Sequence, residues 1–367
     1  MAQSLTKNEE MAQKLKKYRL GYQKCTPPWE CFVRDSSIMH NDFDGTLMKL
    51  FEGTYQMGPV TSKCLIQKFK DGDQLNQYRL LKDLRHPSIV SVENCYEEKG
   101  CPRFVLSWVD GSLTAWLKKD GSGKMFKSTM KGSAPTGAMR QMIFDLCRGL
   151  QHLLDEKLYP INIGRQDICV CRLGHKAVAK LLVNKVEKLR DLGRIEARTE
   201  QLWDEMRMTL YDICKQAAVS LDPLAEMFLM SIGVQNVTRL QSYPDQWDFE
   251  KKARFLLSLM SEDITVILPL VQAAPIEWPK TPKGRVRSPF YEMLEHEAKT
   301  PGGRTYDLNE PFDYLRLCKN MIKHWTVLPQ SVKAECSTVE ELINKMERCN
   351  RLIWCILYDA TASITEK

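Results

Sequence analysis

Two stretches decide how the first part of the chain folds: Leu84–Val90 reads LRHPSIV, and Phe104–Leu117 reads FVLSWVDGSLTAWL. The first closes a segment of helical spacing that begins near residue 74, because Pro87 cannot continue a helix. Apolar residues then alternate in Ile89–Val92 and again at the start of the second stretch, which predicts two strands. A helix followed by two strands is therefore expected here.

The flanking segments extend this order in both directions. Leu47–Phe51 and Cys64–Phe69 are predicted strands that precede the helix. Gly121–Gly137 holds four glycines and few large apolar residues, so we expect a surface loop there. Met139–Leu154 is predicted to be an amphipathic helix and Ile168–Val170 a strand. The C-terminal part of the chain is mostly helical in spacing.

Composition and charge are those of an ordinary globular protein. Hydrophobic residues make up 43% and charged residues 27% of the 367 residues, which allows two or three domains with cores of their own. Residues 243–367 hold 17 Lys and Arg against 18 Asp and Glu, a net charge of −1, so the total of +7 leaves +8 for residues 1–242. A nucleic-acid contact by the C-terminal part must therefore be local.

Cysteine usage and the absence of long apolar runs indicate the compartment. The 13 cysteines are irregularly spaced without a CxxC pair, so we expect buried, reduced thiols rather than a zinc site. No run approaches the ~20 apolar residues of a membrane helix, and residues 1–17 lack the apolar core of a signal peptide. The expected location is cytoplasmic, with the nucleus as the alternative, and no membrane partner is expected.

The order of elements and several short motifs resemble a protein-kinase domain. Leu84–Val90 matches the turn after helix C of that family, and Phe104–Leu117 resembles the hinge and the helix that follows it. Gly149–Leu153 (GLQHL) resembles the end of the helix that precedes the catalytic loop. The resemblance implies a two-lobed α+β domain.

The residues that a kinase needs for phosphoryl transfer are replaced in this chain. By this resemblance the strand lysine reads Gln67 and its glutamate partner reads Gln77, and two neutral amides cannot neutralise phosphates. The catalytic aspartate reads Asn162, and the metal-binding asparagine reads Asp167. Where Asp-Phe-Gly would hold magnesium, the chain reads AKLL around Lys180. We therefore expect a pseudokinase that serves as a dimerisation scaffold, with no metal and no cofactor. Residual nucleotide binding in its cleft is the open alternative, although no pattern in the sequence supports it.

A second group of functional side chains lies in Arg304–His324, which reads RTYDLNEPFDYLRLCKNMIKH. Asn320 and His324 are four residues apart and share a helix face, and the long side chain of Lys319 lies beside that face. A histidine, whose ordinary pKa is ~6.5, is suited to moving protons at neutral pH. A cation and an amide can hold a phosphate. Taken one at a time, these residues are more often solvated charges, and Tyr306 more often a packing residue.

The joint spacing resembles the inositol-requiring enzyme and ribonuclease L family, in which a kinase-like domain is fused to an all-α kinase-extension nuclease (KEN) domain. The family pattern is a tyrosine, then Arg-Asn thirteen residues on, then a histidine four residues after the asparagine; this chain differs only at Lys319. The junction Tyr243–Trp247 also matches at its proline and tryptophan. The resemblance implies an N-terminal arm, a protein-kinase-like domain and a KEN ribonuclease-like domain, at residues 1–28, 29–242 and 243–367.

The family's chemistry implies a metal-independent endoribonuclease that uses the RNA 2′-hydroxyl as nucleophile and leaves a 2′,3′-cyclic phosphate. His324 would be the general acid and Tyr306 the base or hydroxyl-orienting group, while Lys319 and Asn320 would hold the scissile phosphate. RNA is the implied substrate, and a homodimer or a heterodimer with a related kinase/KEN protein the implied assembly. Because lysine lacks the planar fork of arginine, the alternative is a weak or dead pseudoenzyme that pairs with and regulates an active KEN-domain ribonuclease.

Three further segments of the C-terminal part have simpler interpretations. The basic run from Lys280 to Arg287 is expected to be a surface loop that could steer RNA. His296 lies among glutamates on a helix, where a solvated face is favoured over a metal site. A helix over 339–359 is expected to pack in the core.

Overall fold

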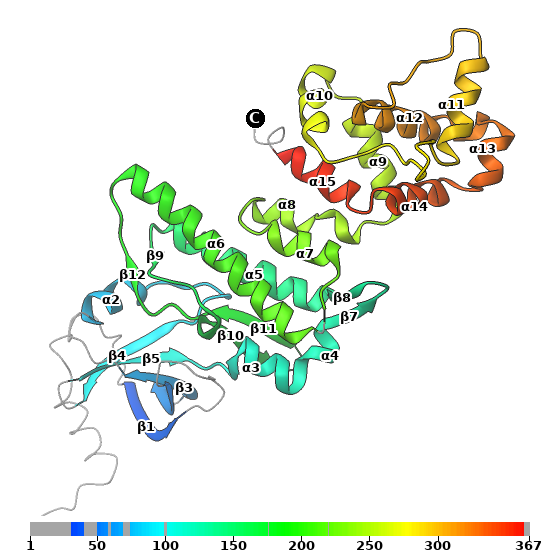
Figure 1. Ribbon diagram of the computed structural model, residues 1–367. Coiled ribbons are helices and arrows are strands. Elements are labelled where there is room, and N and C mark those ends of the chain that lie inside the picture. Colours follow the sequence, from blue (N-terminus) through cyan, green and yellow to red (C-terminus); the bar gives the residue numbers. More distant parts are fainter. Residues whose placement is uncertain are drawn as a thin grey trace, which may run out of the picture. The chain divides into compact units, whose positions relative to one another are not determined.

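The computed structural model describes residues 31–39, 50–57, 60–68, 74–98, 101–174, 176–218 and 220–362 (Figure 1). The chain divides into two compact units, with the boundary between Val237 and Thr238, whereas the sequence placed it at 242/243. The predicted N-terminal arm, residues 1–28, lies outside the described residues, as does most of the strand predicted at Leu47–Phe51.

Unit 1 begins with a five-stranded antiparallel sheet in the order β1-β2-β3-β5-β4. Its central strand β3 is buried from Cys64 to Gln67, and β2 and β5 pair with its two edges. Tyr78 of helix α2 (Gln74–Leu81) packs on Phe104 of β5, with ring centroids 6.0 Å apart. The strands are β1 (Cys31–Met39), β2 (Leu50–Met57), β3 (Val60–Lys68), β4 (Val92–Glu98) and β5 (Cys101–Ser107).

The strand predicted over Ile89–Val92 is wrong in its position, because β4 begins only at Val92. The preceding residues pair with the end of another strand. The Leu181 N–H donates to the Ser88 carbonyl at 2.8 Å, and the Val90 N–H donates to the Leu181 carbonyl at 2.9 Å. The apolar alternation there thus reflects burial between two parts of unit 1, rather than membership of the five-stranded sheet.

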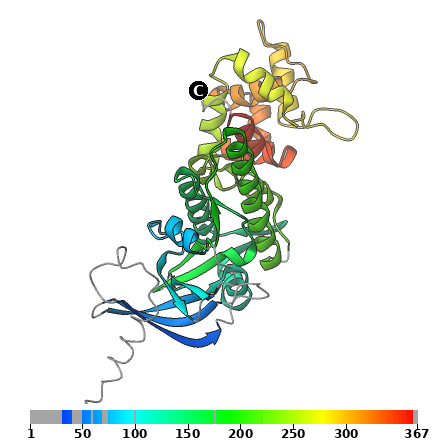
Figure 2. The same cartoon turned by 90° about the vertical axis from the view of Figure 1, so that its left-hand side faces the viewer.

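The rest of unit 1 is mainly helical, and its long helices α5 and α6 lie against each other (Figures 1 and 2). A strand-rich part, one helix inside it and then a helical part is the order expected for a protein-kinase-like domain. The helices are α3 (Leu113–Trp116), η1 (Leu117–Gly121), α4 (Ser122–Met125), α5 (Gly137–Asp155), η2 (Arg165–Asp167), α6 (Leu192–Ala217) and α7 (Pro223–Met230). The strands are β6 (Gly111–Ser112), β7 (Phe126–Thr129), β8 (Gly132–Pro135), β9 (Tyr159–Pro160), β10 (Ile168–Leu173), β11 (Lys176–Leu181) and β12 (Val186–Glu187).

The predicted surface loop over Gly121–Gly137 is also wrong, because α4 and the β7–β8 hairpin occupy it. Polar contacts hold the hairpin. The Thr129 hydroxyl donates to the Asp222 carboxylate at 2.6 Å, and the Asp222 N–H donates to the Ser133 carbonyl at 2.8 Å. A hairpin fixed by hydrogen bonds leaves little trace in an apolar pattern.

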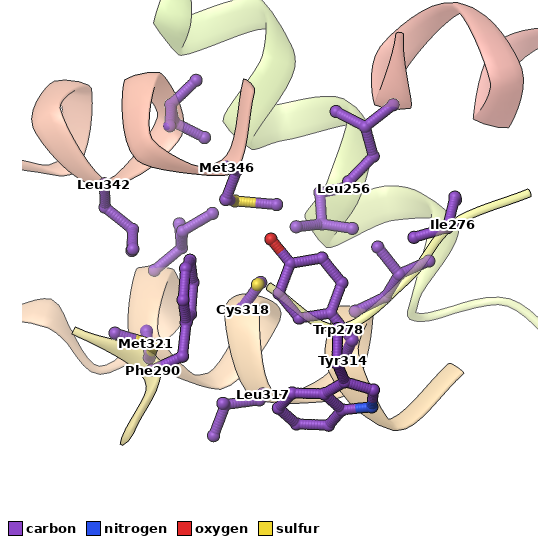
Figure 3. Packing of buried hydrophobic residues seen from close by; sticks show 14 of the residues in the cluster. Leu256, Ile276, Trp278, Phe290, Tyr314, Leu317, Cys318, Met321, Leu342 and Met346 are labelled. Carbon is purple, nitrogen blue, oxygen red and sulfur yellow. The ribbon is translucent and has the colours of Figure 1, made fainter. Parts of the chain in front are cut away.

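The described part of unit 2 is mostly helical, as predicted. Its core is built around α12, whose buried residues Tyr314, Leu317, Cys318 and Met321 recur at helical spacing and meet α9, α11 and α14 (Figure 3). The elements are α8 (Val237–Gln241), η3 (Pro244–Gln246), α9 (Phe249–Leu259), α10 (Ile264–Ala273), α11 (Phe290–Lys299), α12 (Pro311–Lys323), η4 (Trp325–Val327), α13 (Gln330–Glu335), α14 (Val339–Cys349) and α15 (Ile353–Ala360).

The single helix predicted over 339–359 is two helices, α14 and α15, separated at Asn350. The Asn350 amide accepts from the Glu277 N–H at 3.2 Å and donates to the Glu277 carbonyl at 2.9 Å. This reciprocal pair fixes Asn350 at φ −132° and ψ 80°, outside the helical region. The apolar residues on both sides of the break are still core residues, as predicted.

Two further features concern the chain as described. No helix in the described ranges has the length and apolar character needed to cross a membrane. The described cysteines are free thiols, and most of them are buried, as expected.

Candidate functional site

Three of the four predicted site residues lie at the C-terminal end of helix α12, because Lys319 and Asn320 are in its last turns and His324 follows directly. Pro311 occupies the first turn, where its missing N–H costs nothing, and the helix ends at Lys323. His324 caps the helix, and its N–H donates to the Asn320 carbonyl at 3.0 Å. The helix therefore brings the Asn320 and His324 side chains to one end, one turn apart.

Tyr306 joins this pair through a direct hydrogen bond. The Asn320 Nδ2 donates to the Tyr306 hydroxyl at 3.0 Å, and the Arg316 guanidinium lies 4.8 Å from the centre of the tyrosine ring. Arg316 also donates to the Thr305 carbonyl at 2.6 Å, which holds the segment in front of the tyrosine. Two residues fourteen positions apart are thus fixed against each other by contacts from α12.

The pKa of Tyr306 is raised above its ordinary value. Burial is the main cause, and the Glu297 carboxylate adds to it; the Asn320 hydrogen bond and the cations Arg316 and Arg304 act in the opposite direction. The hydroxyl therefore keeps its proton at neutral pH. Since its oxygen already accepts from Asn320, that proton can be donated to a bound ligand.

Asn320 and His324 line a cleft of about 240 Å³. It lies between the end of α12, the end of α11 and the turn after His324, and it offers imidazole, guanidinium, carboxylate and amide groups to a ligand. The lining residues are Met293, His296, Glu297, Arg304, Asn320, His324, Val327, Leu328 and Pro329.

The cleft also contains residues that the sequence did not assign to the nuclease site: His296, Glu297 and Arg304. A tight turn brings them together: the Gly303 N–H donates to the Thr300 carbonyl, and the Arg304 N–H donates to the Glu297 carboxylate, both at 2.8 Å. The adjacent glycines before Arg304 were the available signal. They indicated a turn, but not that the turn folds back onto the last turn of α11.

Lys319 lies on the half-buried side of α12 and does not line the cleft, whereas Arg304 does. Within the described ranges its ammonium has no hydrogen bond or ion pair. The sequence made Lys319 the phosphate-holding cation, but among the described lining residues the guanidinium of Arg304 shares the cleft with His324. Of the four predicted residues, the structure joins Tyr306 to Asn320 and places His324 in the same cleft as Asn320.

The sequence named a metal site at His296 as the less favoured alternative to a solvated face. Across the described residues, no group of three or more His, Cys, Asp or Glu side chains is arranged to hold a metal ion. His296 is exposed at the end of α11, in keeping with the solvated face favoured from the sequence. Its ring is free to meet a ligand in the cleft.

In unit 1, Asn184 joins Gln67 and Asp167, two of the kinase-like positions, into a hydrogen-bonded chain. The Gln67 Nε2 donates to the Asn184 Oδ1 at 2.7 Å, and the Asn184 Nδ2 donates to the Asp167 Oδ1 at 3.1 Å. The Gly164 N–H donates to the Asp167 Oδ2 at 2.9 Å. Burial raises the pKa of Asp167 from 3.8 to about 6, against the opposing effect of that N–H.

The other kinase-like positions lie apart from this chain. Gln77 makes two hydrogen bonds with the backbone of Val186, at 2.8 and 3.1 Å. Asn162 is exposed, and Lys180 lies on β11 opposite Cys169. The sequence placed the Asp-Phe-Gly position at Lys180 and its neighbours, but the residue that lies against Gln67 and Asp167 is Asn184. Asn184 was missed because the motif around it is absent.

No protein-family model matches the chain, and no curated protein matches it in sequence. Among solved structures, a crystal structure of residues 1–466 of Rad53 in complex with AMP-PNP is similar to it, with 15% sequence identity and a TM-score of 0.36. That match covers 50% of this chain and 47% of the Rad53 chain.

Proposed function

We propose that this chain is an endoribonuclease whose reaction takes place in the cleft of unit 2, and that its kinase-like unit does not transfer phosphate. The observation that carries the proposal is the joint placement of Asn320, hydrogen-bonded to Tyr306, and His324 in one cleft with His296 and Arg304. These groups can move protons and neutralise a phosphate without a metal ion.

The reaction transfers the phosphoryl group from the 5′-oxygen to the neighbouring 2′-oxygen. His296 removes the proton of the 2′-hydroxyl, the 2′-oxygen bonds to phosphorus, and the bond from phosphorus to the 5′-oxygen breaks. His324 donates a proton to the departing 5′-oxygen. The products are a 2′,3′-cyclic phosphate and a free 5′-hydroxyl, so protons and charge balance without a further reactant.

Arg304, which lines the cleft, binds the phosphate as charge develops on it, and the Tyr306 hydroxyl, which does not line the cleft but is bonded to the lining residue Asn320, is proposed as a further hydrogen-bond donor. The planar guanidinium of arginine can donate two parallel hydrogen bonds to two phosphate oxygens at once. The ammonium of a lysine is a single point charge and lacks this planar pair of donors. The raised pKa of Tyr306 favours a hydroxyl that donates a hydrogen bond over a phenolate that acts as a base. Asn320 orients this hydroxyl, while Lys319 adds positive charge next to Asn320 on the helix.

The state of unit 1 supports a scaffold role. The side chain at the position of the phosphate-binding lysine is the amide of Gln67, 3% exposed and donating to Asn184. Asp167 lies at the position of the metal-binding asparagine and accepts a hydrogen bond from the side chain of Asn184. With two amides and a carboxyl group bonded to one another, a nucleoside triphosphate would meet little positive charge there.

The test is cleavage of a labelled stem-loop RNA by the full chain, with EDTA present, comparing wild type with His324→Ala. Loss of the acid should reduce the rate by roughly 10²–10⁴-fold. Lys323→Ala is the matched control, because Lys323 is the exposed neighbour at the same helix end and does not line the cleft. Equal rates for wild type and His324→Ala would contradict the proposal.

A second comparison separates the two cations. Arg304→Ala should lower the rate by roughly 10²–10³-fold, as the loss of a group that stabilises the transition-state charge does. Lys319→Ala should lower it less than tenfold. The reverse order would return the phosphate-binding role to Lys319, as the family resemblance implies.

A further inference from the structure

A second, larger cleft lies in unit 2 beside the loop that follows α10. It encloses about 590 Å³, which is in the size range of ligand-binding pockets. Three separate segments form it: the loop after α10, the residues just before and at the start of α12, and the end of α14. The lining residues are Pro275, Ile276, Glu277, Trp278, Pro279, Lys280, Arg287, Leu308, Asn309, Pro311, Arg348, Cys349 and Asn350.

The charges on its walls are mostly positive. Lys280, Arg287 and Arg348 are exposed cations, and Glu277 is the acid among the described lining residues. Arg287 is held in place, since its Nε donates to the Lys280 carbonyl at 3.0 Å while its terminal nitrogens remain available. Within the described ranges, none of the three cations forms an ion pair. This concentration of charge contrasts with the balance of −1 over residues 243–367.

The cleft is a built feature of the unit rather than a gap between mobile loops. Asn350 is tied to the backbone of Glu277 by two hydrogen bonds, which join the end of α14 to the loop after α10. The Trp278 Nε1 donates to the carbonyls of Asp307 and Glu310, at 3.1 and 3.0 Å. Its ring packs on Tyr314 in the core (Figure 3), with ring centroids 5.4 Å apart.

These contacts also connect the two clefts of unit 2. The segment that Trp278 holds follows Tyr306 directly and leads into α12. Its residues Leu308 and Asn309 line the larger cleft, called the basic cleft from here on because of Lys280, Arg287 and Arg348. Tyr306, just before this segment, contacts Asn320 of the catalytic cleft. A strand of nucleic acid bound in the basic cleft would therefore be held by the same frame that carries the cleavage site.

We propose that this cleft binds the phosphate backbone of single-stranded RNA through Lys280, Arg287 and Arg348. The inference rests on the proposed function, because it identifies a second contact for the same substrate. Trp278 is 4% exposed and its N–H is already bonded, so it offers no face on which a base could stack. The cleft thus positions the strand through phosphates and does not read its bases.

The test is binding of a fluorescent single-stranded RNA to the full chain carrying His324→Ala, measured by anisotropy over a range of salt concentrations. Lys280→Ala/Arg287→Ala is compared with Lys283→Ala/Arg285→Ala, which removes two exposed cations of the same loop that do not line the cleft. The cleft pair should weaken binding at low salt at least tenfold and reduce the slope of log K against log salt by about 1.4. The control pair should change affinity less than twofold.

Two further variants test whether the loss of binding comes from the charge of this cleft. Arg348→Ala, on a different element, should weaken binding about threefold to fivefold, and no effect would overturn the assignment to this cleft. Lys280→Arg/Arg287→Lys keeps both charges and should bind like the parent, which excludes misfolding as the cause of the loss. Equal losses in the cleft pair and the control pair would also overturn the inference.

Failure of this inference can be told apart from failure of the proposed function. If wild type does not cleave RNA but the cleft pair alone loses binding, the basic cleft binds RNA and the proposed catalysis is wrong. If wild type cleaves RNA and neither pair changes binding, the proposed catalysis stands and the basic cleft has no role in it.

Discussion

Asp167 is a carboxyl group buried to 4% exposure in unit 1, and burial raises its pKa to about 6. Between about pH 4 and pH 6 the folded chain keeps this proton, while the unfolded chain, with the ordinary pKa, releases it. The stability that the group contributes is thus present at low pH and lost as the pH rises through about 6. A rise from 3.8 to about 6 corresponds to about 3 kcal/mol.

The comparison of wild type with Asp167→Asn isolates this effect. Asparagine keeps only one acceptor oxygen, so one of the two hydrogen bonds that Asp167 accepts from Gly164 and Asn184 is lost at every pH, which adds a constant offset, but asparagine carries no charge. We expect the wild type to lose up to about 3 kcal/mol of unfolding free energy relative to the variant between about pH 4 and pH 7. Urea unfolding followed by circular dichroism measures the difference. A difference that does not vary with pH would show that the buried carboxyl does not titrate in this range.

His296 and Tyr306 are the two candidates for the base that activates the 2′-hydroxyl. Because the pKa of Tyr306 is raised, removal of its hydroxyl should cost only a hydrogen bond. Tyr306→Phe should slow cleavage by about tenfold, corresponding to roughly 1.4 kcal/mol, whereas His296→Ala should slow it by at least about 10²-fold. Single-turnover rates decide the order. A larger loss in Tyr306→Phe would make the tyrosine the base.

At this scale the sequence could predict the residues that share a helix, but not those that meet through a turn. Asn320 and His324 lie four residues apart on α12, so their common side followed from helical spacing alone. Arg304 comes to lie in one cleft with His296 of α11 because residues 300–303 fold back onto that helix. That contact depends on a close backbone approach, which no periodic pattern records.

Among the elements, the turn between α11 and the Tyr306 segment has the tightest steric requirement. A Cβ atom on Gly303 would lie 1.9 Å from the Glu297 carbonyl oxygen and 2.9 Å from that of Thr300. Gly303→Ala must therefore displace the end of α11 together with Glu297 and Arg304. We expect a loss of about 1–3 kcal/mol of stability and at least a tenfold loss of cleavage.

Gly123→Ala is the matched control for this change. An added Cβ there meets nothing within 4 Å, and the residue lies in α4, so stability should stay the same or rise slightly. Thermal unfolding and the cleavage assay are measured on both variants. Full activity in Gly303→Ala would mean that the turn does not position the cleft.

The elements that the sequence predicted correctly are those with strong apolar periodicity. α5 and α12 bury one face each, and their predicted segments are helices. The β7–β8 hairpin and the break at Asn350 were missed, because side-chain hydrogen bonds to distant segments determine both. Apolar spacing does not distinguish one long helix from two helices with a polar residue between them.

In the whole molecule, a kinase-like unit that lacks the charges needed to bind a nucleotide's phosphates is followed by a helical unit with the proposed cleavage site. If the first unit serves as the dimerisation scaffold, dilution should separate the chains and lower the specific activity. We expect the cleavage rate per chain to rise with protein concentration and to level off where sedimentation shows dimers. A rate per chain that is independent of concentration, with only monomers present, would contradict the scaffold role.

The most direct test of the central claim is the chemistry of the cleaved ends. Wild-type chain is incubated with a stem-loop RNA in EDTA over a range of protein concentrations, and the fragments are identified by mass spectrometry. We predict fragments with 2′,3′-cyclic phosphate and 5′-hydroxyl ends, no cleavage of an otherwise identical loop with 2′-deoxy sugars, and none with His324→Ala. If neither wild type nor Lys319→Arg produces such fragments at any concentration, the chain is not a ribonuclease and its role is that of a binding partner.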